Sequence, residues 1–356
     1  MSFWRDKRVF LTGHTGFKGA WLALWLTDLG AKVTGYSLAP PTEPSLFEMA
    51  GVKGMLQHIE GDVRDLEKLS AAIASYQPDV VIHMAAQSLV RLSYQSPVET
   101  YDTNVMGTVK LLEAVRQAGG ARSVICVTSD KCYENKETGV AYVEGDPMGG
   151  HDPYSSSKGC SELVVSAYRD SYFPADRLAS HGVAIASVRA GNVIGGGDWA
   201  KDRLLPDLMR GFASGEKTLI RFPNAVRPWQ HVLEPLSGYM RLAERLWDGD
   251  PVAASAWNFG PSADDAQPVG WIADRTATIW GGSAGWRNEG QPQPHEAGTL
   301  RLNCSKARDQ LNWTPAWDLD EALARTVAWY RALQDGAEMH GFTLSQIRSH
   351  PAYAAV

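Results

Sequence analysis

A hydroxyl, an acid and a base stand side by side in the segment VTSDKCYEN, residues 127–135. Asp130 and Lys131 directly follow the apolar stretch SVICVTS, which ends at Ser129 and is typical of a buried strand. A carboxyl group donates a proton at neutral pH only where burial or a hydrogen bond keeps it neutral. A lysine accepts a proton only where its ammonium is destabilised. The segment is therefore a candidate for proton transfer, and a solvated loop is the alternative.

A tyrosine and a lysine four residues apart form a second candidate pair. Tyr154 and Lys158, in PYSSSKGCSEL, fall on one face of a helix predicted over residues 154–172. An ammonium near a phenol favours the phenolate, and a cationic nicotinamide would favour it further, so Tyr154 could act as a base toward an alcohol. The alternative is an ordinary helix surface, because this spacing alone is common.

A glycine-rich turn opens the first predicted helix, in LTGHTGFKGAWLALWL. Gly13, Gly16 and Gly19 follow a strand and precede a helix. Glycines at such a turn let the backbone approach a pyrophosphate, and the helix N-terminus supplies amide donors and partial positive charge. The turn therefore predicts a dinucleotide site, and an unliganded turn is the alternative.

The end of the second predicted strand bears on which dinucleotide is bound. It reads GYSLAPPTEPS, with no acid at the strand tip to hold an adenosine ribose. No Arg or Lys lies between Tyr36 and Val52 to take a 2′-phosphate, which favours NAD over NADP. Asp62, in GDV, could lie near the adenine; a turn or a helix N-cap is its alternative role.

Strand-like and helix-like segments alternate through the first half of the chain. Strands are predicted over 8–13, 31–38, 79–85, 123–129 and 183–191, and helices over 17–29, 65–75, 97–118 and 154–172. This alternation predicts an α/β fold, a doubly wound parallel sheet covered by helices on both faces. Ligands should then lie at the carboxyl ends of the strands.

The composition and pattern of the sequence change after about residue 191. GNVIGGGDW is glycine-rich, prolines interrupt the pattern, and nine of the thirteen tryptophans lie between 229 and 329, where we expect most of them to pack in a core. We predict a domain over 1–190 that binds the dinucleotide and a smaller lobe over 191–356, with some later segments returning to the first domain. Residues 319–334 form a closing amphipathic helix, and the tail beyond either docks or frays.

Composition and charge exclude several classes of protein. Hydrophobic residues make up 44% and charged residues 21%, as in ordinary globular proteins, and the net charge of −6 gives no sign of a nucleic-acid or membrane surface. The four cysteines show no close pairing, and no apolar signal core or membrane span is visible. We therefore expect a cytoplasmic protein. No metal site is expected, because His231 and His295 lack ligand spacing.

Taken together, these motifs resemble the extended short-chain dehydrogenase/reductase family, and within it the nucleotide-sugar 4,6-dehydratases. The resemblance runs from TGHTGFKGAW through HMAAQSLVRLSY, YDTNVMGTVKLLEAVR, TSDKCYEN, PYSSSK, RAGNVIGGGDW, RPWQHVLEPLSGYM and LNWTP. TGHTGFKG, TSDKCY and PHEAGTLRL are similar to the branch that dehydrates CDP-glucose. The resemblance implies a modified Rossmann fold, bound NAD and a smaller C-terminal α/β lobe for the sugar nucleotide. It further implies a homodimer or homotetramer built on helices near 100–117 and 154–172. It also implies a step in deoxysugar biosynthesis, as for lipopolysaccharide O-antigen.

The resemblance also implies roles for the catalytic candidates. Tyr154, supported by Lys158, takes the proton of the sugar's carbon 4 hydroxyl while hydride passes to NAD, and Ser129 binds the carbon 4 oxygen. Asp130 protonates the hydroxyl that leaves carbon 6. These dehydratases usually carry Asp-Glu, so Lys131 departs from the pattern. It acts as the base at carbon 5, or it orients Asp130 or binds a sugar hydroxyl.

Binding residues follow from the same motifs. NAD contacts are expected at the glycine turn, in the GDV segment, at the end of the strand predicted over 79–85 and at the Tyr-Lys pair: Gly13, Thr15, Gly16, Phe17, Lys18, Gly19, Asp62, Val63, Ala85, Ala86, Gln87, Tyr154 and Lys158. Sugar-nucleotide contacts are expected at Gln87, Arg91, Asn104, Asn192, Arg203, Arg227 and Arg301, the last two as diphosphate ligands. His83 is expected to satisfy backbone groups.

Three alternatives remain open beside dehydration of CDP-glucose. The first is dehydration of another nucleotide hexose, and the second is 4-epimerisation on the same fold. Asp130 and Lys131 argue against epimerisation, which needs no acid for a leaving group. The third is a regulator that senses a dinucleotide, against which the presence of both Tyr154 and Lys158 argues.

Overall fold

A parallel sheet forms the centre of the protein, in a computed structural model that describes residues 2–288 and 298–355. Its strand order is β10-β6-β5-β4-β1-β2-β3, and each neighbouring pair runs parallel. The strands are β1 (Arg8–Thr12), β2 (Lys32–Ser37), β3 (Gln57–Glu60), β4 (Val80–His83), β5 (Ser123–Val127), β6 (Ala184–Ala190) and β10 (Ala256–Phe259). The predicted doubly wound parallel sheet is thereby confirmed.

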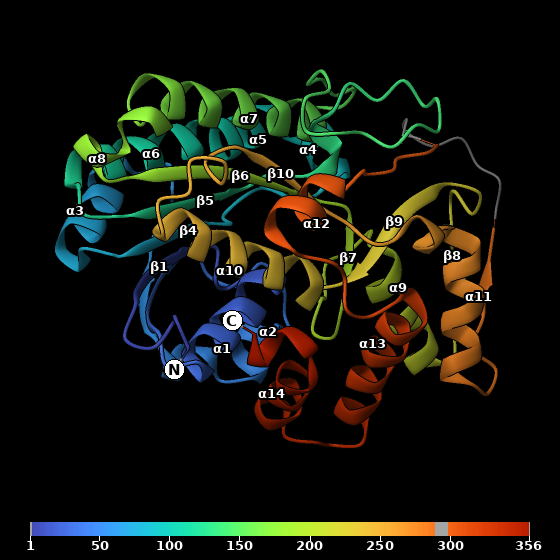
Figure 1. Cartoon of the computed structure of the whole chain (residues 1–356). Helices are drawn as coiled ribbons and strands as arrows, with labels where there is room; N and C mark the ends of the chain where they lie inside the picture. Colours follow the sequence, from blue (N-terminus) through green and yellow to red (C-terminus); the bar gives the residue numbers. More distant parts are fainter. Residues whose placement is uncertain (1, 289–297, 356) are drawn as a thin grey trace.

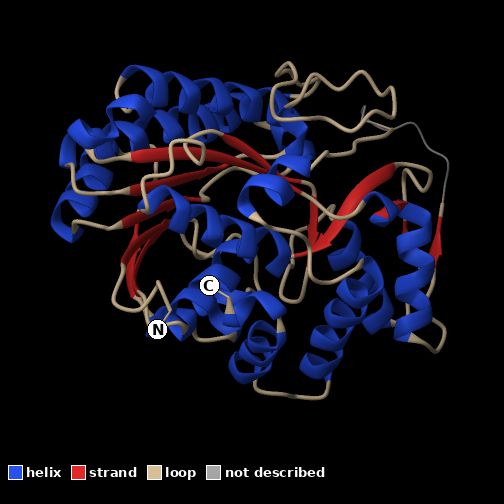
Figure 2. Cartoon of the chain, viewed as in Figure 1, coloured by secondary structure: helices blue, strands red, loops and turns tan. Residues whose placement is uncertain are grey.

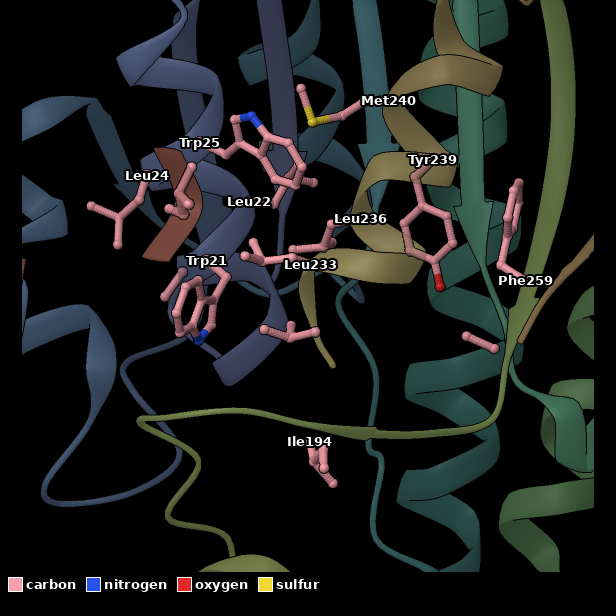
Figure 3. Packing of buried hydrophobic residues seen from close by; sticks show 14 of the residues in the cluster. Trp21, Leu22, Leu24, Trp25, Ile194, Leu233, Leu236, Tyr239, Met240 and Phe259 are labelled. Atoms are coloured by element: carbon pink, nitrogen blue, oxygen red, sulfur yellow. The ribbon is translucent and has the colours of Figure 1, made fainter. Parts of the chain in front are cut away.

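Helices cover both faces of this sheet, as Figures 1 and 2 show. One face carries α3 (Leu66–Tyr76), α6 (Gly107–Ala118) and α7 (Pro153–Ser171), and the other carries α1 (Phe17–Asp28) and α10 (Leu233–Trp247). The central strands β4, β5 and β6 are almost wholly buried, as expected of a sheet covered on both sides. Figure 3 shows α1 and α10 meeting through Trp21, Trp25, Leu233 and Leu236, all fully buried.

The predicted helix over 97–118 is interrupted. It consists of α5 (Pro97–Tyr101), a π-helical turn over Asp102–Met106, and α6. π-Turns within helices are often found at functional sites, where they aim a side chain that a regular helix would place elsewhere. Asn104 lies at the middle of this turn. The short helices α2 (Leu46–Met49), α4 (Val90–Gln95) and α8 (Leu178–His181) complete this half of the chain.

The residues after about 191 build smaller elements beside the carboxyl edge of the main sheet (Figure 1). They form a sheet of β7 (Asn192–Ile194), β9 (Val226–His231) and β11 (Ala266–Pro268), and a pair of β8 (Thr218–Leu219) with β12 (Trp286–Arg287). Helices α9 (Leu204–Ser214), α11 (Val269–Trp280), α12 (Ser305–Leu311) and α13 (Leu319–Gln334) pack around them. β10 lies in the main sheet, although it follows β9 in sequence. The domain boundary at residue 190 stays a prediction.

The tail beyond α13 docks on the first helix. Helix α14 (Met339–Ser349) contacts α1, and Arg348 Nε donates to an Asp28 carboxylate oxygen at 2.9 Å. The next residue but one, His350, is 2% exposed and lies 2.9 Å from the buried carboxylate of Glu234 on α10. The C-terminal segment therefore belongs to the core.

Gly196 offers a test of how tightly the later half of the chain packs. A Cβ at this position would lie 1.9 Å from the ring of Trp329, a fully buried residue of α13. We expect Gly196→Ala to lower the free energy of unfolding by about 1–3 kcal/mol, because neither the backbone nor the indole has room to shift. Chemical denaturation measures this.

The matched control is Gly54→Ala, where a Cβ would meet nothing within 4 Å. It should stay within about 0.5 kcal/mol of the wild type. Equal stability of the two variants would contradict the packing described for Gly196.

Candidate active site

The glycine turn after β1 is shaped by close backbone approaches. Gly13 has a φ of 78°, and a Cβ there would lie 2.7 Å from the amide nitrogen of Ala85. A Cβ on Gly19 would lie 2.1 Å from the carbonyl oxygen of Gly13. Gly16 is the N-cap of α1, and a Cβ there would make only an ordinary contact. The backbone therefore packs too closely for a side chain at Gly13 or Gly19, and a phosphate contact at the N-terminus of α1 stays a prediction.

Three strand ends converge around this turn. The Thr15 hydroxyl lies 2.8 Å from that of Ser37 at the end of β2. Thr12, at the end of β1, accepts the amide of Ala85 at 3.2 Å and lies 2.7 Å from His83 Nδ1. Burial lowers the pKa of His83 to about 3, which favours the neutral ring. The ring was expected to satisfy backbone groups, but its partners are the hydroxyls of Thr12 and Thr108. Phe17 borders the same turn, near Gly195.

The side chain of Asp62 is engaged by its neighbour. Arg64 forms an ion pair with it at 2.6 Å, and the hydrogen bond from Arg64 is the main cause that lowers the pKa of Asp62. The carbonyl of Asp62 accepts the hydroxyl of Tyr36 at 3.0 Å, and Val63 is buried against Gly107. Asp62 thus lies at the tip of β3, but its contact with an adenine stays a prediction.

Asn104 fastens the loop after β4 to the π-helical turn. It is 2% exposed, and its amide donates to the carbonyl of Gln87 at 2.9 Å and to the hydroxyl of Ser157 at 2.8 Å. Its carbonyl accepts the amide of Gln87 at 2.8 Å. The Gln87 side chain bonds to Leu89 and Thr100. Both amide hydrogens of Asn104 are engaged, so the structure shows a scaffolding contact. Its expected substrate contact stays a prediction.

The turn after β5 holds the opening acid in a buried place. Ser129 donates to Asp130 Oδ1 at 3.0 Å and accepts the amide of Lys131 at 3.2 Å. Asp130 is 2% exposed, and its Oδ2 is buried with no hydrogen-bond partner among the described residues. Burial raises the pKa of Asp130, against the opposing effects of Lys131 and Ser129. The carboxyl is therefore held toward its neutral form, as a proton donor requires.

Lys131 is half-buried beside this acid. Its positive charge favours the ionised form of Asp130, which opposes burial. The position therefore agrees with any of the roles expected from the sequence, namely the base at carbon 5, a group that orients Asp130, or a ligand of a sugar hydroxyl.

Helix α7 presents Tyr154 and Lys158 to the same turn. Asp152 caps the helix by accepting the amide of Ser155 at 2.9 Å, so Tyr154 lies in the first turn. Burial raises the pKa of Tyr154 to about 12, although the Ser129 hydroxyl opposes this. Burial also lowers the pKa of Lys158 to about 8, and its Nζ lies 3.4 Å from the carbonyl of Val127.

This result differs from the expectation for Tyr154. The sequence predicted a phenol whose pKa is lowered by Lys158, whereas in the protein alone burial outweighs the lowering by Ser129 and Arg203. The expected second contribution, that of a cationic nicotinamide beside the phenol, stays a prediction.

Positively charged side chains from several elements affect the pKa values of the groups in this site. Burial lowers the pKa of Lys18, on α1, to about 8, and the charges of Lys158 and Arg203 lower it further. The charge of Arg203 also acts on Tyr154, and that of Arg227, on β9, acts on Asp130. Positive charge therefore gathers here although the whole chain is net negative, which suits an anionic ligand.

The predicted arginines hold defined partners. Arg203 lies 2.9 Å from both Asp198 and the Ser88 hydroxyl, and Arg91 pairs with Asp202 at 3.3 Å. Ser88 and Arg91 follow β4, whereas Asp198 and Arg203 follow β7. These contacts therefore join the two halves of the chain at the carboxyl edge of the sheet.

Arg227 and Arg301 border the segment that follows residue 297. Arg227 is 5% exposed and donates to the carbonyl of Gly298 at 3.2 Å. Nε of Arg301 is buried and has no hydrogen-bond partner within the described ranges. Asn192 is half-buried and pairs with Trp229 between β7 and β9. A buried unpaired guanidinium nitrogen is costly, and the expected diphosphate contact of Arg301 stays a prediction.

Asp198 and Ser88 were not predicted as site residues. Both hold Arg203, and the carbonyl of Asp198 accepts the hydroxyl of Tyr330. The acid five residues before Arg203 was a usable signal for Asp198. The sequence carries no comparable signal for Ser88, because only the fold brings the loop after β4 to Arg203.

Two further features concern ions and membranes. Within residues 2–288 and 298–355, no group of three or more His, Cys, Asp or Glu is placed to hold a metal ion. In the same part of the chain, no helix is both long and apolar enough to cross a bilayer. His295 and the PHEA part of the PHEAGTLRL motif lie outside the described residues.

Comparison with known proteins gives a consistent result. The family model described as GDP-mannose 4,6 dehydratase matches residues 10–245. A CDP-glucose 4,6-dehydratase of Salmonella typhimurium is 56% identical over 95% of this chain and 94% of its own. The solved UDP-glucose 4-epimerase of Thermotoga maritima, with UDP-glucose, has a TM-score of 0.78 at 19% identity, covering 92% of this chain and 99% of that chain.

A dTDP-glucose 4,6-dehydratase of Bacillus anthracis in complex with NAD has a TM-score of 0.76 at 20% identity, covering 94% of this chain and 99% of that one. Both solved structures share the fold described above. The family model and the Salmonella relative match the same stretch that holds the glycine turn, the Asp130 turn and helix α7. The chain therefore belongs to the nucleotide-sugar 4,6-dehydratase family of extended short-chain dehydrogenases/reductases.

Proposed function

We propose that the protein uses NAD to convert CDP-glucose to CDP-4-keto-6-deoxyglucose. The observation that carries the proposal is the buried, partly unpaired carboxyl of Asp130 beside the Tyr154–Lys158 pair. Oxidation of an alcohol by NAD would require only the Tyr154–Lys158 pair. A carboxyl held toward its neutral form adds an acid, and an acid is what the departure of a hydroxyl requires.

Each catalytic side chain handles one proton in this scheme. Tyr154 accepts the proton of the carbon 4 hydroxyl, and Ser129 holds the resulting oxygen. The carbon 4 ketone acidifies carbon 5, whose proton is lost to a base, for which Lys131 is one candidate. Asp130 gives its proton to the hydroxyl on carbon 6, which leaves as water. NAD, held by the glycine turn and the Tyr154–Lys158 pair, would supply a reversible hydride acceptor, and the base would return its proton to carbon 5, so that no net oxidation would occur.

CDP-glucose is favoured as the substrate by the Salmonella relative, which is named a CDP-glucose 4,6-dehydratase and is similar along nearly the whole chain. The TSDKCY segment supports the same choice, because Lys131 replaces the Glu usual in sister dehydratases. A UDP-glucose 4-epimerase from Mycolicibacterium smegmatis is also related, at 26% identity. Epimerisation has no leaving group to protonate, so it would not require the buried acid Asp130.

Mass spectrometry tests this function directly. Purified protein with NAD and CDP-glucose should give a product lighter by one water, and the specificity constant should be higher for CDP-glucose than for dTDP-, UDP- or GDP-glucose. A product of unchanged mass would indicate the epimerase. A higher specificity constant for dTDP-, UDP- or GDP-glucose would assign the protein to another branch of the dehydratases. A requirement for NADP would overturn the cofactor assignment.

Mutation should separate oxidation from elimination. With Tyr154→Phe the first hydride transfer should slow severely, so no reduced nicotinamide builds up. With Asp130→Asn oxidation can proceed, but water loss should slow by about two to four orders of magnitude, because the leaving hydroxyl gets no proton. Reduced nicotinamide should then accumulate on the enzyme, visible by single-turnover absorbance.

The control for this pair is Asp170→Asn, which removes an exposed carboxylate from the far end of α7. It should behave as the wild type. Wild-type turnover by Asp130→Asn would show that Asp130 is not the acid.

We propose further that a second copy of this chain covers the outer face of α5, the π-helical turn and α7. Large apolar side chains are exposed there: Val98 is 81% exposed, Leu163 62% and Tyr172 52%, and Tyr94, Tyr101 and Met106 lie on the same elements or next to them. Exposed apolar groups gathered on neighbouring helices mark an interaction surface. Figure 1 shows these helices on the side of the sheet away from α1 and α10.

Light scattering at micromolar concentration should report at least a dimer. Leu163→Asp should shift the protein toward monomer, because an ionised carboxylate would be buried unpaired at the interface. Val252→Asp, an exposed apolar position in the loop after α10, is the control and should leave the mass unchanged. A wild-type monomer would refute the assembly.

A cytoplasmic location remains a proposal as well. All four cysteines are unpaired, and Cys126 and Cys132 are buried. Burial raises the pKa of both thiols, so they are inert rather than reactive. Unpaired thiols fit a reducing compartment. The link to O-antigen deoxysugars stays a prediction.

A further inference from the structure

A buried carboxylate lies one helical turn beyond Lys158. Glu162, on α7, accepts hydrogen bonds from the Thr128 hydroxyl, from the Ser187 hydroxyl at 2.7 Å and from Arg189 at 2.8 Å. The side chains of Glu162 and Arg189 are each 4% exposed. Both carboxylate oxygens are therefore satisfied, and the donors come from β6 and from the residue that follows β5.

These contacts bracket the turn that carries Asp130. Thr128 immediately precedes the four residues Ser129–Cys132, and Tyr133 immediately follows them. Arg189 donates to the Tyr133 hydroxyl at 2.7 Å, and that hydroxyl donates to Asn258, on β10, at 2.7 Å. One ion pair thus holds both flanks of the turn.

Helix α7 lies in direct contact with the turn that carries Asp130. A Cβ on Gly159 would lie 2.9 Å from the carbonyl oxygen of Gly149 and 3.2 Å from that of Cys132. Gly149 in turn donates its amide to the Cys132 carbonyl at 2.8 Å. The helix that carries Tyr154 therefore packs directly against the turn that carries Asp130.

A buried ion pair is a poor way to gain stability, because the cost of removing two charges from water roughly cancels their attraction. Its better attested use is to specify one arrangement over others. Here the arrangement fixed is that of the β5 turn relative to α7, which holds the acid on one element and the base on the other.

We propose that Glu162 and Arg189 form a positioning clamp that sets the placement of Asp130 relative to Tyr154, so that one sugar pose serves both oxidation and elimination. This inference rests on the proposed function. The clamp also acts on Lys158 electrostatically. Burial lowers the pKa of Lys158, and the negative charge of Glu162 opposes this. Other titratable groups whose charge couples to Lys158 are Cys126 and Cys132, beside the β5 turn, His83 on β4 and Lys18 on α1.

Thr128→Val tests the clamp while leaving the Glu162–Arg189 ion pair in place. It removes one hydroxyl without changing the side-chain shape. We expect kcat to fall by about tenfold to a hundredfold, as for a misplacement of about 1 Å, with KM changed less than about twofold. Thr128→Ser keeps the hydroxyl and should recover most of that loss. A role in stability alone would lower the melting temperature without this split.

The matched control is Thr326→Val, another buried threonine whose hydroxyl bonds only to its own helix, far along the chain in α13. Its kcat should equal that of the wild type. If Thr128→Val also keeps the wild-type kcat, the clamp is overturned.

Hydrogen exchange gives a readout that needs no turnover. Amides of the segment 129–132 should exchange at least about tenfold faster in Thr128→Val than in the wild type and Thr128→Ser. The hydrogen-exchange measurement still tests the clamp if CDP-glucose proves not to be the substrate. Unchanged exchange would overturn the clamp and leave the proposed function standing.

Glu162→Gln provides a second test through the pH profile. Without the negative charge the pKa of Lys158 falls further, so Lys158 loses its proton at lower pH. The alkaline limb of the kcat profile should then move to lower pH by on the order of one unit. An unmoved limb would refute the electrostatic part. If this variant does not fold, the Thr128 series still decides the positioning.

Discussion

The desolvation of ionisable groups at the carboxyl edge of the sheet is the constraint on which the rest of the site depends. Asp130, Tyr154, Lys158 and Lys18 all carry pKa values displaced toward the uncharged form, and burial is the largest cause in each case. A parallel sheet covered on both faces makes this possible, because its strand ends open into a space walled by helices. Water would restore ordinary pKa values and remove the distinction between acid and base.

Such an environment is unfavourable without compensation, and the two halves of the chain supply it together. Lys18 and Lys158 come from helices on opposite faces of the main sheet, whereas Arg203 and Arg227 come from the later elements. The charge of Arg203 acts on Tyr154 and Lys18, and that of Arg227 acts on Asp130, so the later half acts on groups that the first half provides. An anionic sugar nucleotide placed among them would relieve the repulsion between the cations, so that substrate binding and the ordering of the site are linked through charge.

The sequence was sufficient for the parts of this architecture that depend on local pattern. Alternating apolar runs predicted the strands, and the glycine spacing placed the turn whose close contacts Gly13 and Gly19 show. It was insufficient where a contact joins distant segments. No residue near Asn104 in the sequence predicts a π-helical turn, because its partner Gln87 is brought in by the fold. No residue near Tyr154 predicts that its pKa is raised, because the burial that raises it also comes from the fold. The placement of Asp130 was predictable only as a requirement of its chemistry.

The docking of the tail on α1 bears on how the chain is made. Asp28 ends the helix that begins at the glycine turn, and it is held by Arg348 and by the Tyr353 hydroxyl at 2.7 Å. His350 likewise packs edge-on against Trp25. During synthesis this helix leaves the ribosome well before the residues that cover its outer side, because Arg348 follows Asp28 by 320 residues. The nascent protein must therefore carry a partly uncovered apolar helix until the segment around Arg348 has emerged, and loss of that segment would expose the helix that begins at the glycine turn.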